Sequence, residues 1–106
     1  MGFLNFWKRA DINAGFAEYR QAEKAYLLDV RTQQEYRQGH IPGSINVPQQ
    51  TVEYIASVIR NKEVPLYVYC YSGARSKACV AQLQRMGYSN VKNIGGIVSY
   101  TGELDS

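Results

Sequence analysis

Apolar runs and amphipathic segments alternate along most of this chain. Runs rich in β-branched and aromatic residues predict strands at residues 26–30, 44–47, 66–69 and 91–93. Segments with helical periodicity predict helices at residues 11–22, 33–38, 50–60 and 75–86. In the third of these helices, one apolar face holds Val52, Ile55, Ala56 and Ile59. This alternation favours an α/β fold with a mainly parallel sheet covered by helices on both faces.

Composition limits the size and the partners of this fold. A chain of 106 residues with 45% hydrophobic content predicts one domain, residues 1–106, around one core. The net charge is +3, and the 12 basic and 9 acidic side chains are spread along the chain without a basic stripe. We therefore expect no nucleic-acid partner, because nucleic-acid binding normally requires clustered Lys and Arg.

The first nine residues contain a brief apolar patch made of Phe3, Leu4, Phe6 and Trp7. Positive charges follow this patch, whereas they would precede the apolar region of a signal peptide. No run approaches the roughly 20 apolar residues that span a bilayer. Phe6 also argues against a myristoylation signal at Gly2. The sequence predicts a soluble cytoplasmic protein that binds no membrane, with the patch packed on the domain in preference to a partner.

The most informative segment joins the strand at 66–69 to the helix at 75–86. Cys70 stands at the carboxyl end of that strand, the edge at which open α/β sheets bind ligands. Gly73 allows a positive φ that turns amides inward, and Arg75 adds a positive charge. Free N–H groups at the start of the helix favour a thiolate. We predict a nucleophilic Cys70 in a binding loop formed by Tyr71, Ser72, Gly73, Ala74, Arg75 and Ser76.

The length of this loop distinguishes two chemistries. A cysteine-dependent phosphatase uses Cys-X5-Arg, a wide loop whose arginine grips two phosphate oxygens. Here the spacing from Cys70 to Arg75 is Cys-X4-Arg. A tighter loop suits a single sulfur atom added to the cysteine, which favours a persulfide intermediate.

Three blocks of this sequence, in order, resemble the rhodanese family. The upstream block comprises residues 27–32, Glu35-Tyr36 and residues 39–46, and the loop from Cys70 to Ser76 forms the second block. The third block is residues 93–97, followed by Tyr100 where the family usually has tryptophan. The resemblance covers nearly the whole chain. It implies a rhodanese-like α/β fold, with a mainly parallel five-stranded sheet flanked by helices on both faces.

The resemblance also implies a thiosulfate sulfurtransferase type of transferase that works by double displacement. Cys70 would attack the outer sulfur of thiosulfate or another donor, and the amides of Tyr71 to Ser76 would hold the persulfide. A thiol or cyanide acceptor would then remove the sulfur. No cofactor besides the persulfide is expected.

Asp29 and Arg31 flank Val30 at a predicted strand end, so both side chains point to one side near Cys70. The resemblance places Asp29 in the hydrogen-bonded framework of the site. Arg31 either forms an ion pair with Asp29 or Glu35, which the solvated surface would weaken, or lines the rim of the pocket. Gly95 and Gly96, in the third block, predict a tight chain reversal.

Two further residues have both a chemical and a structural interpretation. Cys79 is either a thiol that resolves the persulfide or a buried residue on the face of Leu83 and Met86, and the second is favoured. His40 is either a general base for Cys70 or part of a tight turn in His-Ile-Pro-Gly, and the turn is favoured. The few histidines and cysteines predict no metal site.

The second loop position departs from the family pattern. Members specialised for thiosulfate often carry more positive charge here, whereas this loop has Tyr71, and Arg75 as its one cation. Tyr71 would suit a persulfide donor or a protein partner, so a role as a carrier in a sulfur relay stays open. A non-catalytic interaction module and a phosphatase are the alternatives to a sulfurtransferase.

Overall fold

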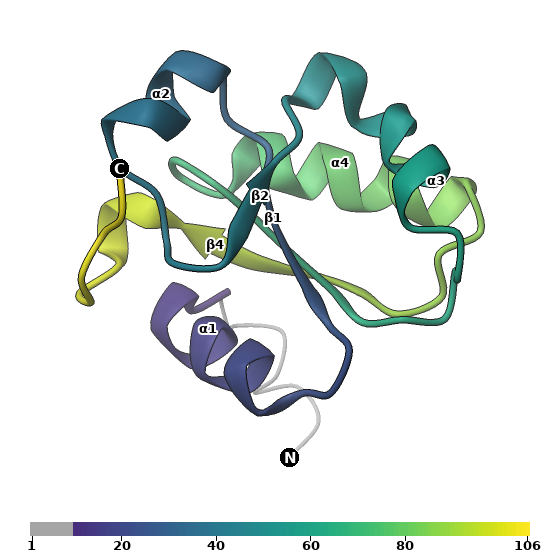
Figure 1. Ribbon diagram of the computed structural model, residues 1–106, viewed down its shortest axis with the longest axis horizontal. Helices are drawn as coiled ribbons and strands as arrows, with labels where there is room; N and C mark the ends of the chain where they lie inside the picture. The colour runs from purple at the N-terminus through teal and green to yellow at the C-terminus, as the bar shows by residue number, and fades with distance from the viewer. Residues whose placement is uncertain (1–9) are drawn as a thin grey trace, which may run out of the picture.

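Strands and helices follow one another along the chain (Figure 1). The strands form a four-stranded parallel sheet in the described residues, with the order β2-β1-β3-β4. The computed structural model describes residues 10–106, so the apolar patch of Phe3, Leu4, Phe6 and Trp7 lies outside the described residues. The strands are β1 (Tyr26–Asp29), β2 (Ser44–Asn46), β3 (Leu66–Cys70) and β4 (Val91–Gly96). The helices are α1 (Ile12–Gln21), α2 (Gln33–Gln38), α3 (Ile55–Val58) and α4 (Ala74–Arg85), with 3-10 helices η2 (Gln49–Tyr54) and η3 (Ile97–Ser99).

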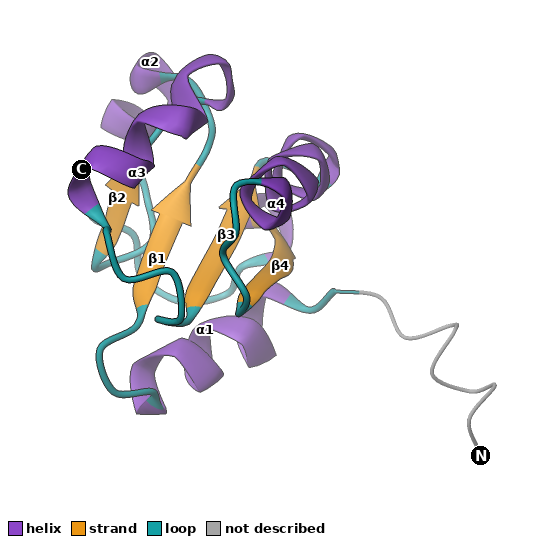
Figure 2. Cartoon of the chain, turned by 90° about the vertical axis from the view of Figure 1, so that its right-hand side faces the viewer, coloured by secondary structure: helices purple, strands orange, loops and turns teal. Residues whose placement is uncertain are grey.

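Helices cover both faces of the sheet, which confirms the predicted α/β fold. Helix α1 lies on one face, and α3 and α4 lie on the other (Figure 2). Side chains along β3 alternate between the two faces, as the pleat requires. Leu66, Val68 and Cys70 belong to the core under α3 and α4, whereas Tyr67 and Tyr69 belong to the core under α1. Cys70 therefore points toward the face on which α4 packs.

The prediction of five strands is wrong for the described residues, which form four. After β4 the chain enters η3, and its last pairing is an isolated antiparallel bridge between His40 and Asp105. A single bridge does not extend into a ladder, so no strand is added at that edge. None of the helices in residues 10–106 combines the length and apolarity that a membrane span requires.

The single helix predicted at 50–60 is also wrong, because the chain forms η2 and then the short α3. Thr51 has non-helical angles, with φ −122° and ψ 20°. Both its amide (2.9 Å) and its hydroxyl (3.2 Å) donate to the carbonyl of Pro48, which tightens the first turn into a 3-10 arrangement. The predicted apolar face survives, since Val52, Ile55 and Ile59 are buried.

Gly95 and Gly96 do not form the predicted chain reversal. Both belong to β4 and pair with Tyr69 and Cys70, just after a register shift at which β4 has one more residue, Ile94, than β3. A Cβ on Gly96 would lie 2.2 Å from the carbonyl oxygen of Tyr71 and 2.6 Å from Cα of Ser72. Gly96 therefore lets the end of β4 lie directly against the loop that follows Cys70.

Candidate active site

Cys70 is the last residue of β3, and its sulfur is enclosed by the loop that leads into α4. The residue is only 1% exposed. The amide of Gly73 donates to Sγ at 3.0 Å, the amide of Ser76 lies at 3.4 Å, and the Ser76 hydroxyl also lies at 3.4 Å. Donors directed at one atom create a site suited to negative charge on sulfur.

Two opposing effects act on the ionisation of Cys70. Burial alone would raise the pKa of the thiol, because it disfavours the charged form. Hydrogen bonds from the Ser76 hydroxyl and from the amides of Ser76, Gly73 and Ser72 stabilise the thiolate and outweigh burial. The pKa of Cys70 is consequently lowered from its ordinary value.

Gly73 makes this arrangement of amides possible. It is the residue before α4 and has φ 102°, a left-handed conformation that favours glycine. No side chain caps the first turn of α4. The amide of Ser76, in that turn, is therefore free to donate to Cys70.

Asn93 on β4 organises the loop from behind, a role that was not predicted. Its Oδ1 accepts from the Ser76 hydroxyl at 2.7 Å and from the amide of Gly95 at 3.0 Å. Its Nδ2 donates to the carbonyl of Gly73 at 3.2 Å. The bond to Gly95 is an Asx turn, so an asparagine two residues before a glycine was the available signal. The link to Ser76, 17 residues away, left no signal in the sequence.

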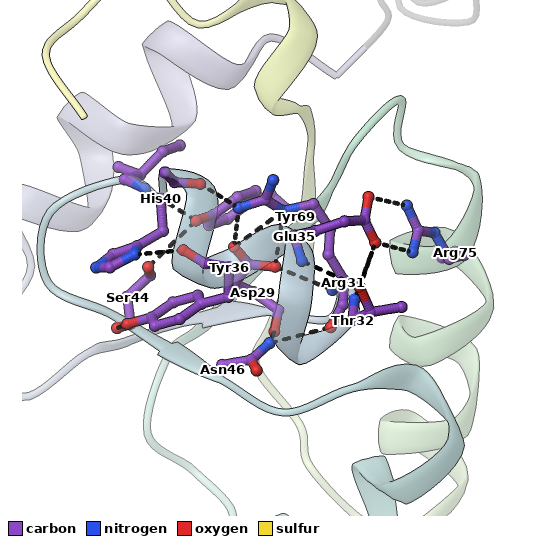
Figure 3. A network of polar contacts seen from close by, with 12 residues as sticks. Asp29, Arg31, Thr32, Glu35, Tyr36, His40, Ser44, Asn46, Tyr69 and Arg75 are labelled. Carbon is purple, nitrogen blue, oxygen red and sulfur yellow. Dashed lines mark hydrogen bonds and ion pairs between the residues drawn. The ribbon is translucent and has the colours of Figure 1, made fainter. Parts of the chain in front are cut away.

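Asp29 and Arg31 form a buried ion pair at the end of β1 (Figure 3). Arg31 Nη2 lies 2.7 Å from Asp29 Oδ2, and the residues are 5% and 0% exposed. The same nitrogen donates to the carbonyl of Gly39 at 2.7 Å. Burial would lower the pKa of Arg31, but the hydrogen bonds and charge of Asp29 raise it. Of the two alternatives for Arg31, a solvated ion pair is therefore wrong, because both residues are buried and the pair joins β1 to the turn before β2.

Arg75 is held by Glu35 and makes no hydrogen bond to the sulfur. Its Nη1 and Nη2 lie 2.8 Å and 3.0 Å from the two carboxylate oxygens of Glu35 (Figure 3). Glu35 also closes the capping box of α2 with Thr32. Hydrogen bonds from Arg75, ahead of the opposing effect of burial, lower the pKa of Glu35 to about 2. Hydrogen-bond donors, rather than Arg75, thus supply the direct stabilisation of the Cys70 thiolate.

Beside the loop lies a recess of about 360 Å³, which we call the side recess. Its polar wall contains Arg31 and Glu35. Its apolar wall contains Tyr71, Ile97, Val98 and Leu104. Three of these apolar residues, Tyr71, Val98 and Leu104, are more than half exposed. The remaining loop residues, Ser72 and Ala74, are also exposed.

Cys79 and His40 occupy structural positions. Cys79 is buried in the core under α4, and burial raises the pKa of its thiol to about 11. Nδ1 of His40 donates to the carbonyl of Tyr36 at 2.9 Å, and the two rings stack at 3.7 Å. These contacts account for both residues without a part in the chemistry of Cys70.

The fold and the site define an α/β protein with a buried, hydrogen-bonded cysteine at the carboxyl edge of a parallel sheet. The rhodanese-like domain model matches residues 13–103. A thiosulfate sulfurtransferase, PspE of Escherichia coli strain K12, is 39% identical over 73 residues, which cover 68% of this chain and 70% of PspE. This chain belongs to the rhodanese-like domain family.

Two further comparisons agree with this membership. The adenylyltransferase and sulfurtransferase uba4 of Ogataea parapolymorpha is 36% identical over 90 residues, which cover 83% of this chain. The match spans only 23% of uba4, so this chain corresponds to one part of that larger protein. The structure of an E. coli rhodanese with anions superposes with a TM-score of 0.71 at 34% identity, covering 76% of this chain and 96% of that one.

Proposed function

We propose that this protein is a sulfurtransferase that carries sulfur as a persulfide on Cys70. One observation carries the proposal: the buried Cys70 sulfur accepts hydrogen bonds from Gly73 and Ser76, and its pKa is lowered. Such a sulfur ionises more readily than an ordinary thiol, which favours its action as a nucleophile, and it is shielded from bulk solvent. The similarity to named sulfurtransferases supports the same class of reaction.

In the first step, the Cys70 thiolate attacks the outer sulfur of a donor such as thiosulfate. A bond forms between the cysteine sulfur and the donor sulfur while the S–S bond of the donor breaks. Sulfite leaves with the bonding electron pair, and the negative charge passes to the terminal sulfur of the persulfide. The loop amides and the Ser76 hydroxyl stabilise charge at the cysteine before the attack.

In the second step, a thiolate or cyanide acceptor attacks the terminal sulfur. The persulfide bond breaks, and its electron pair returns to Cys70 as a thiolate, so the same hydrogen bonds stabilise the leaving group. The cycle requires no external oxidant or reductant. A protein acceptor in a sulfur relay would be served by the same step, since the loop residues Tyr71, Ser72 and Ala74 are exposed.

The geometry disfavours a phosphatase. A phosphate ester would need a guanidinium to grip two of its oxygens. Both terminal nitrogens of Arg75 are already bound to Glu35, and the low pKa of Glu35 keeps that carboxylate charged at neutral pH. Hydrolysis of an aryl phosphate would contradict the proposal.

The decisive experiment measures the intact mass of the reduced protein before and after incubation with thiosulfate or with a persulfide donor. Transfer of one sulfur adds about 32 Da, which we expect for wild type and for Cys79→Ala and not for Cys70→Ser. Release of thiocyanate on addition of cyanide would then complete the cycle. If neither donor adds mass, the protein is a non-catalytic interaction module and the proposal is wrong.

A further inference from the structure

The charges around the side recess are already balanced within the protein. Among the described residues that line it, the charged ones are Arg31 and Glu35. Arg31 is paired with the buried Asp29, and Glu35 is paired with Arg75. A donor that enters next to the loop therefore meets paired cations and the carboxylate of Glu35.

Arg75 would otherwise be an anion-binding group. It is the second residue of α4, and the charge of Cys70 is among the influences that raise its pKa, after the hydrogen bonds and charge of Glu35. The charge of the Arg75 guanidinium and the charge of the Cys70 thiolate therefore attract each other. The bidentate contact with Glu35 occupies the nitrogens that would bind a doubly charged donor.

The opposite wall of the side recess favours an uncharged substituent. Tyr71, Val98 and Leu104 are 51%, 57% and 52% exposed, so each has apolar surface that a ligand would bury. The amide of Val98 donates to the carbonyl of Tyr71 at 3.1 Å, which fixes this wall relative to the loop. Burial of an apolar substituent is favourable here, whereas a second negative charge loses hydration, and the described lining residues offer no unpaired cation to replace it.

We propose that the Glu35–Arg75 pair makes the site selective for singly charged organic sulfur donors, with an apolar substituent in the side recess, over the thiosulfate dianion. Glu35 is then the residue that determines specificity. This inference rests on the proposed sulfurtransferase function. In the reaction, Cys70 attacks the outer sulfur of an organic thiosulfonate, the S–S bond breaks, and a sulfinate leaves with the electron pair.

Three donors separate charge from apolar contact. Thiosulfate carries two negative charges, methanethiosulfonate carries one, and benzenethiosulfonate carries one together with an apolar ring. The rate constant for persulfide formation on Cys70 is measured with each donor by rapid quenching and mass spectrometry. Each variant is compared with wild type on the same donor, so the intrinsic reactivity of that donor cancels.

Glu35→Gln tests the charge. Glutamine keeps the acceptor that the α2 capping box needs but releases Arg75 from its charged partner. We expect the rate with thiosulfate to rise about fivefold relative to the rate with methanethiosulfonate, as for one charge freed at a partly exposed site. The gain should shrink at 1 M salt and vanish in Glu35→Gln/Arg75→Met. Glu63→Gln is the matched control, because it removes an exposed carboxylate before the start of β3, at the end opposite Cys70.

Leu104→Ser tests the apolar wall. It should lower the rate constant with benzenethiosulfonate about threefold relative to the rate constant with methanethiosulfonate. Equal changes with all three donors in Glu35→Gln, or no change, would overturn the inference about Glu35. If the ratio of the rate constants with benzenethiosulfonate and methanethiosulfonate is unaltered in Leu104→Ser, the side recess does not bind the apolar substituent of the donor. The absence of any persulfide with all donors would instead refute the proposed function, so the two failures are distinguishable.

Discussion

Replacement of Ser76 by alanine isolates the contribution of one hydrogen bond to the reactivity of Cys70. The hydroxyl contacts Sγ at 3.4 Å, Oδ1 of Asn93 at 2.7 Å and the carbonyl of Gly73 at 3.1 Å. Without it, Oδ1 of Asn93 still accepts from the amide of Gly95, and the carbonyl of Gly73 still accepts from Nδ2 of Asn93. The sulfur likewise keeps the amides of Gly73 and Ser76, so the variant removes one of its three hydrogen bonds and leaves no acceptor without a donor.

The magnitude follows from the geometry. A hydrogen bond to a charged group contributes about 1.5 to 3 kcal/mol. The long distance to Sγ and the competition of Asn93 for the single hydroxyl proton place Ser76 at the lower limit, and about 1.4 kcal/mol corresponds to a tenfold change in an equilibrium. Ser76→Ala should therefore reduce the thiolate fraction about tenfold at pH values below the titration of Cys70.

The rate of alkylation changes less than the thiolate fraction does. A more basic thiolate is a stronger nucleophile, with a Brønsted coefficient of about 0.4 to 0.5. With iodoacetamide, the rate for Ser76→Ala should therefore be about threefold to fourfold lower than for wild type at low pH. At high pH, where Cys70 is ionised in both proteins, it should be about threefold higher. The two pH–rate profiles must cross.

The assay is the rate of alkylation of Cys70 from pH 4 to pH 10 in a Cys79→Ala background, followed by intact mass. Since the pKa of Cys70 is lowered in the folded protein, its inflection should move to higher pH in Ser76→Ala. Unfolding by urea should remain nearly unchanged, because no other buried group is left without a partner. Parallel profiles that never cross would refute the reasoning, since they would mean that the hydroxyl does not affect ionisation.

Three further predictions concern the framework of the site. Asp29→Asn should lower the free energy of unfolding by about 3 kcal/mol in urea titrations, because it leaves the buried charge of Arg31 without a carboxylate. Gly96→Ala should prevent persulfide formation even where folding persists, because its Cβ would overlap the carbonyl of Tyr71 and displace the loop. Glu35→Gln should flatten the acid limb of the stability curve: the lowered pKa of Glu35 adds stability above about pH 4.5, which wild type loses as the pH falls through about 2.

Each of these predictions has an internal comparison. Gly87→Ala places alanine at φ 103° in the turn after α4, where the nearest side chain is the flexible Lys62, so it should affect stability without affecting the sulfur. The Asp29→Asn loss should be recovered largely in Asp29→Leu/Arg31→Met, which buries no charge. A cost below about 1 kcal/mol for Asp29→Asn would contradict a buried ion pair. An acid limb that Glu35→Gln leaves unaltered would contradict the lowered pKa of that carboxylate.

Local patterns were sufficient for the secondary structure near the site. The apolar run before Cys70 and the periodicity after Arg75 bracket the end of β3 and the start of α4 within one residue. The helix predicted at 50–60 failed because hydroxyl and amide bonds from Thr51 to one carbonyl compete with helical bonding. The chain reversal predicted at Gly95 and Gly96 is wrong because glycine occurs both in chain reversals and where another backbone lies very close, and Gly96 is an example of the second.

The sequence by itself determined the alternation of strands and helices, the position of Cys70 at a strand end and the left-handed glycine in its loop, because each depends on neighbours a few residues apart. Only the tertiary structure decided which charges and donors meet. Glu35 and Arg75 are 40 residues apart, and Asn93 and Ser76 are 17 apart. Glu35 and Arg75 meet because β1 and β3 are parallel neighbours, so the helices that follow them begin at the same edge of the sheet. Asn93 reaches Ser76 because β4 is the other neighbour of β3 and places this side chain under the start of α4.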